Sequence, residues 1–577
     1  MKRRKKKAGL LPLLALAAVL FTACAADDAD TDRQNPKPDT AGLTAFVMED
    51  STDSPETRLA GEYTGSGVDF YWSDNDRLFL NAPVDNPPRD EWLIDKWNNI
   101  HELARTNSGG PGRTPRATFW FEGEFTKPEY RVRYFGKNSD VSHNFDEMSI
   151  PREYNYVGPY IRGLEDAHQG DFATGIARRQ PDGNYTFTLE HKASYITFRP
   201  YSEQTAFTKW GGAYVNQIEV SADQALCGLF KIKGDTIDLS SRPVDDMYKK
   251  SICIHNYNVF IRLIKGNPPA VPPVSDHMYD DPSYAIMAIA PGTYTNFTVR
   301  YVFETRNMGG YGYITKTYPR VTFTAGKNKV ISQNLQAPEY PGDRYYMWDA
   351  AVGQHYWKGY EWDGPSPNQP VNDSGSMKGD KNPKNNQDSR WYNEVAPYAD
   401  PTGAAPAVAA TRSCKDLPNV NELCWYCEYG SGYKGDVEIY RVMNNLYSAK
   451  LWFRKLSAIA KSVGKTVDEL KAKAPDGIDY TRSIQKPNFG TGPQTVEKPD
   501  DLKDYFCLPM MGVYEPDTDG NGYFGNMGEM LYYWSSTPVP GRPDYAYALQ
   551  AGEFTRGLKV VILPRKYGAC TMWPADR

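Results

Sequence analysis

Short runs of alternating apolar and polar residues fill most of this chain before residue 400. In the segment SYAIMAIAPGTYTNFTVRYVFET, Phe297, Val299, Tyr301 and Phe303 occupy every second position, so they share one face of a β-strand. The segments VNQIEVSA, CGLFKIKGDTIDLSS and YGYITKTYPRVTFTAGKNKVISQNL show similar runs, split by Gly, Pro and Asp turns. Many short strands with regular turn signals predict a mainly β fold made of sandwiches.

The N-terminal part of the chain has the same character. LTAFV, beginning at Leu43, predicts a strand, and VDFYWSDNDRLFLNAP predicts two short strands around a turn. ATFWFEGEF at 117–125 alternates apolar and polar residues. GNYTFTLEHKASYITFRP predicts a hairpin-like pair, in which one face carries Tyr185, Phe187 and Leu189 and another carries Ile196 and Phe198.

Composition limits the classes of function. The chain has 577 residues, of which 40% are hydrophobic, and a formal net charge of −5. These values are typical of a soluble globular protein of three or four domains, without a basic stripe for nucleic acid. The 41 Tyr and 13 Trp favour β-structure and surfaces that stack on ligands.

The sequence changes after Leu335, where QAPEYPGDRYY marks a break, and residues 363–411 are rich in Gly, Pro and Asn. LPNVNELCWYCEYG predicts a short helix capped by Asn419 or Asn421, and a capping box, Thr466 to Glu469, predicts another. LYSAKLWFRKLSAIAKSVG has the strongest helical pattern in the chain and predicts a helix that ends at Gly464. Its apolar positions are Leu446, Leu451, Phe453, Leu456, Ile459 and Val463.

The N-terminus predicts export. Six basic residues at 2–7 precede the apolar run GLLPLLALAAVLFTA, which is short for a membrane span. We expect a signal peptide at 1–23 and a polar linker at 24–42. Cys24, after small residues, resembles the cysteine of a bacterial lipobox, which implies a lipid (palmitate) anchor at the outer membrane. The alternative is an ordinary secretory signal. Asp27, Asp28 and Asp30 resemble the acidic surface-export signal of outer-membrane lipoproteins. The alternative is that they belong to an ordinary polar linker without a signal.

Seven of the eight cysteines follow Cys24, and an odd number leaves at least one thiol free or paired between chains. Cys424 and Cys427 form a CxxC, but neither a second CxxC nor a His pair completes a zinc site. We expect structural thiols or one disulfide rather than redox or metal chemistry.

The order of motifs up to residue 338 resembles the fimbrillin-like pilins, lipoprotein subunits of type V pili. The phrases LEHKASYITF, NQIEVSADQALCGLFKI and APGTYTNFTVRYVF carry the resemblance. It implies two transthyretin-like β-sandwiches, at 43–200 and 201–338. It also implies that a protease cuts after export, here near Arg58 or alternatively Arg33, and removes the first strand. A neighbour's strand would then fill the groove. The alternative for Arg58 is an ordinary surface arginine.

The tail resembles C-type-lectin-like modules of gut-anaerobe lipoproteins. LPNVNEL, CLPMMGVY, YYWSST and the closing GLKVVIL carry this resemblance, with Asn419 where Thr is usual and Leu423 and Cys424 where Trp is expected. It implies an α+β lectin-like domain at 339–577.

Two groups of residues in this tail are candidate ligand sites. Asp517, Asp519 and Asn521 place oxygen ligands at alternate positions, which suits Ca²⁺, although an acidic hairpin turn is the favoured explanation. A dense aromatic cluster suits a carbohydrate platform or a domain core; its members are Trp348, His355, Tyr356, Trp357, Tyr360 and Trp362. No cofactor other than this Ca²⁺ is indicated.

No catalytic motif is found, and the histidines are scattered, so we do not predict an enzyme. A polymerising pilin needs a donor strand at its C-terminus, and the expected third domain at 339–577 occupies that position here. We therefore expect an adhesive tip subunit of a cell-surface pilus (fimbrium), with other pilins and a host or bacterial glycan or protein as partners. The alternative is a resident surface lipoprotein that binds its ligand without a pilus.

Overall fold

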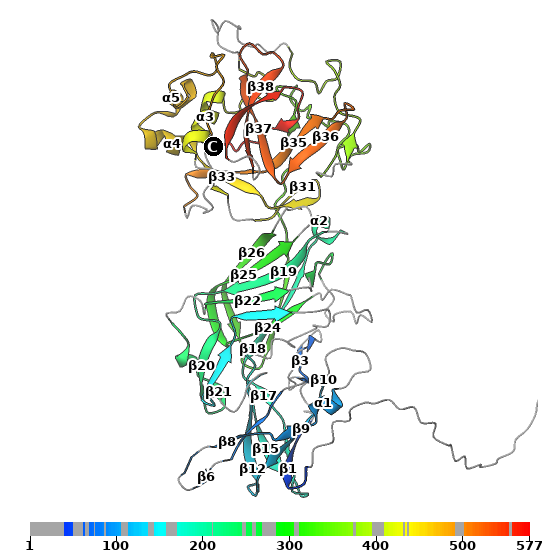
Figure 1. Ribbon diagram of the computed structural model, residues 1–577, viewed down its shortest axis with the longest axis vertical. Helices are drawn as coiled ribbons and strands as arrows, with labels where there is room; N and C mark the ends of the chain where they lie inside the picture. Colours follow the sequence, from blue (N-terminus) through cyan, green and yellow to red (C-terminus); the bar gives the residue numbers. More distant parts are fainter. Residues whose placement is uncertain are drawn as a thin grey trace, which may run out of the picture. The chain divides into compact units, whose positions relative to one another are not determined.

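Figure 1 shows the computed structural model. It describes residues 40–577 apart from 50–61, 64–67, 74–75, 83, 86–87, 90, 105–112, 137–143, 157–169, 210–211, 245–249, 257–260, 268–283, 305–310, 373–376, 395–408, 431–432, 435–437, 491–500 and 553–556. All the elements below lie in the compact unit Gly42–Arg577. The fold is mainly β, as predicted. No helix in the described part of the chain is long and apolar enough to cross a membrane.

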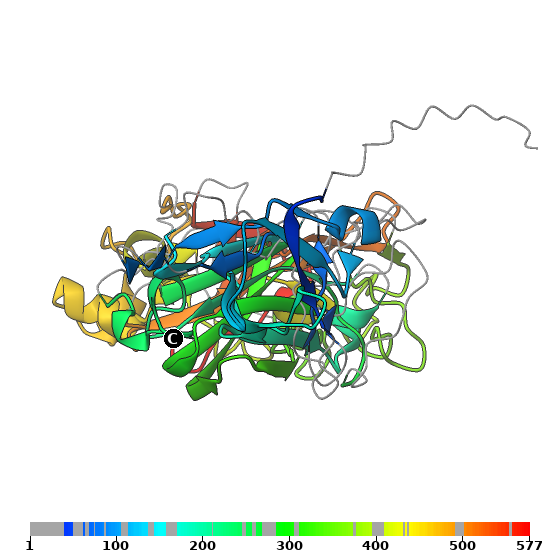
Figure 2. The same ribbon diagram turned by 90° about the horizontal axis from the view of Figure 1, so that it is seen from below.

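The first sheet has nine strands in the order β8-β5-β12-β15-β16-β1-β11-β9, with β17 paired to β15. Figure 2 shows its strands in blue and cyan from below. The strands are β1 (Leu43–Met48), β5 (Phe79–Asn81), β8 (Trp92–Ile94), β9 (Trp97–Asn98), β11 (Thr118–Glu122), β12 (Glu129–Tyr134), β15 (Ala173–Arg179), β16 (Tyr185–Phe187) and β17 (Glu190–His191).

This sheet curls until its two ends approach each other. β8 and β9 are consecutive in the chain but stand at opposite ends of the strand order. Between them, Asp95 donates its N–H to the Leu78 carbonyl, beside β5, and Lys96 donates its N–H to the Trp120 carbonyl in β11. The short pieces nearby are β2 (Glu62–Tyr63), β3 (Val68–Asp69), β4 (Trp72–Ser73), β6 (Val84–Asp85), β7 (Pro88–Arg89), β10 (Arg113–Thr114) and α1 (Ile100–Leu103).

A second group of strands forms two layers. One is the sheet β14-β22-β19-β25-β26 with β23 on β19, and the other places β18 between β24 and β27. Phe198 of β18 meets Tyr301 of β25 edge to face, with ring centroids 6.5 Å apart. The elements are β13 (Glu147–Ile150), β14 (Glu153–Tyr156), β18 (Ser194–Tyr201), α2 (Thr205–Thr208), β19 (Tyr214–Ser221), β20 (Gly228–Lys233), β21 (Thr236–Ile237), η1 (Leu239–Ser241), β22 (Ser251–Asn256), β23 (Ile261–Arg262), β24 (Ala285–Ile289), β25 (Gly292–Glu304), β26 (Tyr311–Phe323) and β27 (Asn328–Asn334).

The alternation in β25 is confirmed, because all four of its predicted inward residues, Phe297, Val299, Tyr301 and Phe303, are fully buried. The predicted hairpin between β16 and β18 is wrong. β16 pairs with β1 and β15 in the first sheet, whereas β18 pairs with β24 and β27. Strand pairing also crosses the boundary expected at residue 200, since β13, β14 and β18 all pair with strands of the second group.

The C-terminal part has its own cores. Its main sheet runs β28-β40-β37-β35-β36-β29, with β38 joining β37 to β39, and α3 packs against β37, β38 and β39. The elements are β28 (Tyr345–Tyr346), β29 (Lys378–Gly379), α3 (Val420–Tyr429), β30 (Tyr433–Lys434), β31 (Tyr440–Val442), β32 (Asn445–Tyr447), β33 (Lys450–Arg454), α4 (Leu456–Val463), α5 (Val467–Ala472), β34 (Tyr505–Pro509), β35 (Met511–Pro516), β36 (Gly522–Met527), β37 (Met530–Pro538), β38 (Tyr545–Gly552), β39 (Lys559–Pro564) and β40 (Ala569–Cys570).

The capping box predicted at Thr466 is confirmed at the start of α5. Of the two caps predicted for the helix before it, Asn419 is the one that starts α3, and it also forms a capping box with Glu422. The long helix predicted through Leu446, Leu451 and Phe453 is wrong in its first half. β32 and β33 occupy that stretch, and only Leu456–Val463 is helical, ending at Gly464 with φ 69°. β33 takes its partner, β34, from about fifty residues further along the chain.

Candidate functional site

The first strand, β1, lies in the interior of the nine-stranded sheet. Leu43 to Val47 pair antiparallel with β11, from Glu122 back to Thr118. On the other side, Phe46 to Met48 pair in parallel with Tyr185 to Phe187 of β16. Both neighbours come from much later in the chain, so β1 fills a position between two strands that it does not adjoin in sequence.

Phe46 is the central apolar contact of β1 and is fully buried. Its ring stacks on Tyr185, with centroids 4.6 Å apart and planes inclined by 9°. The rings of Phe121 and Phe125 meet it edge-on at 5.1 and 5.5 Å, and Tyr130 lies at 6.4 Å. These four rings form a socket whose shape fits one aromatic side chain.

Met48 lies two residues along the strand on the same face as Phe46 and is also buried. The Trp72 indole donates its Nε1–H to Met48 Sδ at 2.9 Å. Thr44 Oγ1 reaches the Gly123 carbonyl only at 3.5 Å. Backbone ladders and alternate apolar side chains therefore hold β1, with little help from polar side chains.

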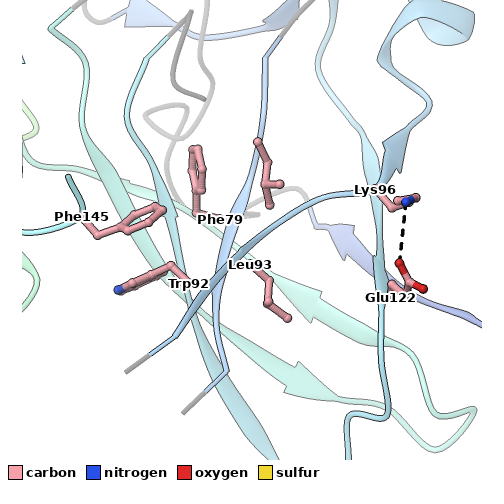
Figure 3. A pocket seen from close by; sticks show the side chains of 7 residues that line it. Phe79, Trp92, Leu93, Lys96, Glu122 and Phe145 are labelled. Carbon is pink, nitrogen blue, oxygen red and sulfur yellow. Dashed lines mark ion pairs between the residues drawn. The ribbon is translucent and has the colours of Figure 1, made fainter. Parts of the chain in front are cut away.

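An apolar pocket of about 470 Å³ opens where the two ends of the curled sheet meet. Figure 3 shows Trp92 and Phe145 stacked on one side of it, with ring centroids 5.6 Å apart. On the opposite side, Lys96 Nζ and Glu122 Oε2 form an exposed ion pair of 3.7 Å. Glu122 stands opposite Leu43 in the β1–β11 ladder, so the pocket adjoins the start of β1. Sequence reasoning missed it because separate strands supply its walls.

The predicted aromatic cluster is mostly core. Trp348, Tyr356 and Trp357 are fully buried, and His355 is 5% exposed. The Trp348 indole donates to the Ser535 carbonyl at 2.9 Å and lies under the Arg565 guanidinium. Only Tyr360 and Trp362 keep partly exposed faces, so these two are the members that could still stack on a ligand.

His355 is the titratable member of this cluster. Its Nε2 lies 3.2 Å from Glu361 Oε1. Burial lowers the pKa of His355 although the Glu361 carboxylate acts in the opposite direction. The imidazole is therefore held mainly neutral at physiological pH, as expected for a packing residue.

The candidate Ca²⁺ residues form the turn between β35 and β36. Asp517 Oδ1 accepts the backbone N–H groups of Asp519 and Asn521 at 2.9 and 2.8 Å. Lys378 Nζ lies 2.6 Å from Asp517 Oδ2 and 3.7 Å from Asp519 Oδ2. This ammonium holds the pKa of Asp517 below its usual value. Among the described residues, no group of three His, Cys, Asp or Glu is placed to hold a metal ion.

Two predicted modification sites, Cys24 and Arg58, and the alternative Arg33 lie outside the described residues. The remaining seven cysteines are all described, and none of them forms a disulfide with another described residue. Burial raises the pKa of Cys414 and of Cys570 to about 12, so these thiols stay protonated and unreactive.

No protein-family model matches the chain, and no curated protein matches it. Several solved structures show a remote likeness. A protein from Bacteroides uniformis, provisionally assigned to cell adhesion, is 11% identical with a TM-score of 0.27 over 52% of this chain and 94% of its own. A fimbrial assembly protein from Parabacteroides distasonis is 9% identical, with a TM-score of 0.20 over 51% and 91%.

A fimbrial protein from Bacteroides ovatus aligns over 91% of this chain and 98% of its own length, with 10% identity and a TM-score of 0.21. At these identities and TM-scores, the likeness does not assign a function to this chain.

Proposed function

We propose that this protein is an adhesive structural subunit of a cell-surface pilus and that β1 is the strand it gives up on assembly. The observation that carries the proposal is the way β1 is held. It is a short interior strand that buries Phe46 and Met48, bound by two ladders and an aromatic socket but by few polar side-chain contacts within the described part of the chain. Another strand with bulky apolar residues at alternate positions could make the same contacts.

Arg58 lies in the sequence between β1 and β2. A cut there would separate residues 43–48 from the rest of the sheet. Loss of β1 would leave the backbone of β11 and β16 unpaired on facing edges and would open the socket of Phe121, Phe125, Tyr130 and Tyr185. Unpaired edges beside exposed rings are costly in water, which favours capture of a neighbouring subunit's strand.

The proposal extends to a tip position. The chain runs from β27 of the second group into a folded domain, and that domain's β39 and β40 are paired within its own sheet. Such a subunit would accept a strand, while β39 and β40 are already paired and are not free to be donated. The C-terminal domain would then be the part that meets a host or bacterial ligand. The lipid on Cys24 would hold the precursor at the outer membrane until the cut.

The test is the mass and N-terminal sequence of the protein recovered from the cell surface, for the natural chain and for Arg58→Ala, with Arg33→Ala as the matched control. We expect the natural chain and Arg33→Ala to begin just after residue 58, without lipid and within pili. Arg58→Ala should keep its N-terminus and remain outside pili.

A natural chain that begins at lipidated Cys24 in every preparation would reject the proposal. That result would favour the alternative, a resident surface lipoprotein that binds its ligand without assembling. A chain cut at Arg33 instead would reject only the assignment of the site.

A further inference from the structure

A polar cleft of about 410 Å³ lies in the C-terminal domain, apart from the sites above. Two sequence motifs meet there. LPNVNEL supplies the start of α3, including Glu422, and YWSST supplies Ser536 and Thr537 of β37. Lys471 from α5, Lys415, Asp416 and Arg577 complete the charged part of its lining.

The walls of the cleft are tied together by hydrogen bonds. The Val420 N–H donates to Thr537 Oγ1 at 3.0 Å, which joins α3 to β37. Asn419 Nδ2 donates to the Lys471 carbonyl at 2.9 Å, which joins α3 to the end of α5. The cleft is therefore preorganised, as a binding site needs to be.

Glu422 lines the cleft and is only 6% exposed. Its Oε2 accepts the Asn419 N–H at 2.7 Å, while Oε1 accepts no hydrogen bond from the described part of the chain. Burial raises the pKa of Glu422, whereas the cations of Lys471 and Arg577 lower it. Lys471 and Arg577 line the same cleft as this carboxylate.

The rim carries a positive excess. Three cationic side chains, Lys415, Lys471 and Arg577, line the cleft with two carboxylate side chains, Asp416 and Glu422, which leaves one positive charge among the lining side chains. Lys415 and Lys471 are exposed, and Lys415 Nζ reaches Asp416 Oδ2 only at 3.8 Å. Ser536 Oγ has no hydrogen-bond partner among the residues that the structure describes, so it is available to a ligand.

We propose that this cleft binds an acidic saccharide, a sugar unit that carries one carboxylate among its hydroxyl groups; this deepens, and rests on, the adhesive role proposed above. The rim lysines and Arg577 would take the carboxylate by charge-assisted hydrogen bonds. Glu422 Oε1 and Ser536 Oγ would take sugar hydroxyls. A phosphate group fits less well, because its second negative charge would face the Glu422 carboxylate.

The test is calorimetric titration of the full chain with a glucuronic acid oligosaccharide, and with the neutral glucose oligosaccharide of the same length. We expect the acidic ligand alone to bind, and its affinity to fall as salt rises. Lys471→Met should weaken binding about tenfold or more, because it removes one charge-assisted contact. Lys461→Met, at an exposed lysine of α4 outside the cleft, is the matched control and should leave binding unchanged.

Ser536→Ala separates a saccharide from a simple anion. It should weaken the oligosaccharide several-fold but leave a poly-glutamate peptide unaffected. Lys415→Met gives a second charge variant at an exposed position where folding is not at risk.

The inference fails if neither charge variant changes the affinity, if no acidic oligosaccharide binds, or if poly-glutamate binds as well as the sugar. These results would leave the N-terminal processing test untouched, so failure of the cleft and failure of the pilus proposal are distinguishable.

Discussion

β1 and β37 both lie in the interior of a sheet, β1 with two of its six residues buried and β37 with all nine, and they are held in different ways. β1 relies on backbone ladders and on the apolar side chains of Phe46 and Met48. β37 adds side-chain bonds to distant backbone: Trp534 Nε1 donates to the Tyr346 carbonyl at 2.8 Å, and Ser535 Oγ donates to the Tyr547 carbonyl at 2.8 Å. A strand held by ladder and socket can be replaced by another strand, whereas one held by specific polar bonds cannot.

The largest expected effect is at β37. Trp534→Ala removes a fully buried ring and leaves the Tyr346 carbonyl without its donor. We expect a loss of about 4–5 kcal/mol in the unfolding free energy of the C-terminal domain. Urea denaturation followed by tryptophan fluorescence and circular dichroism measures it. Trp534→Phe also loses the indole N–H but keeps an apolar ring, so it should lose clearly less, and equal losses would show that the hydrogen bond and not the ring packing carries the effect.

At β1, Phe46→Ala empties the aromatic socket. We expect a loss of about 3–4 kcal/mol, confined to the first sheet. Hydrogen exchange should then speed up in β11 and β16 but not in β37. Thr44→Ala, at a half-buried position on the same face of the strand, removes only a 3.5 Å contact to the Gly123 carbonyl and should change the stability by less than about 0.5 kcal/mol. Faster exchange in β37 as well would show that the two strands do not open separately.

A smaller effect is expected where α3 is tied to β37. Asn419→Ala removes the capping side chain that accepts the Glu422 N–H at 3.0 Å and should cost about 1 kcal/mol. Thr466→Ala removes the equivalent cap of the exposed helix α5, and we expect a smaller loss there. Thermal unfolding compares the two, and a larger loss at Thr466 would contradict the importance of the α3 junction.

The smallest effect is the pH dependence that His355 confers on the C-terminal domain. Its folded pKa lies below the ordinary value of 6.5, so the unfolded chain binds the proton more readily. Its contribution is complete above pH 6.5 and is lost as the pH falls through 6.5 towards the folded pKa. The melting temperature should therefore decline between pH 7 and pH 5, and less steeply in His355→Gln. Identical slopes would show that other groups dominate.

Local signals in the sequence predicted local structure well. The capping boxes at Asn419 and Thr466 lie within four residues of the groups they satisfy, and the period-two alternation of β25 needs only its own residues. The first half of the predicted long helix failed because Leu451 and Phe453 are two residues apart, a strand spacing, and because the partner strand β34 is distant.

The candidate sites were harder to predict because remote residues assemble them. The socket of Phe46 takes rings from β11, β12 and β16, and the polar cleft joins two motifs more than a hundred residues apart. The aromatic cluster illustrates the converse problem. Composition identified Trp348 and Trp357, but composition cannot distinguish a buried ring from an exposed one.

The double pairing of β1 has a consequence for timing. A strand with neighbours on both sides can leave only by breaking two ladders and withdrawing Phe46 from its socket. The time for which β1 stays in the sheet is therefore set by the height of the energy barrier to its departure, which is a matter of kinetic stability. Covalent attachment to the rest of the chain does not set this time. A cut in the chain after β1 would not by itself eject the strand. Severing and departure would be separate events, and the second would wait for an invading strand.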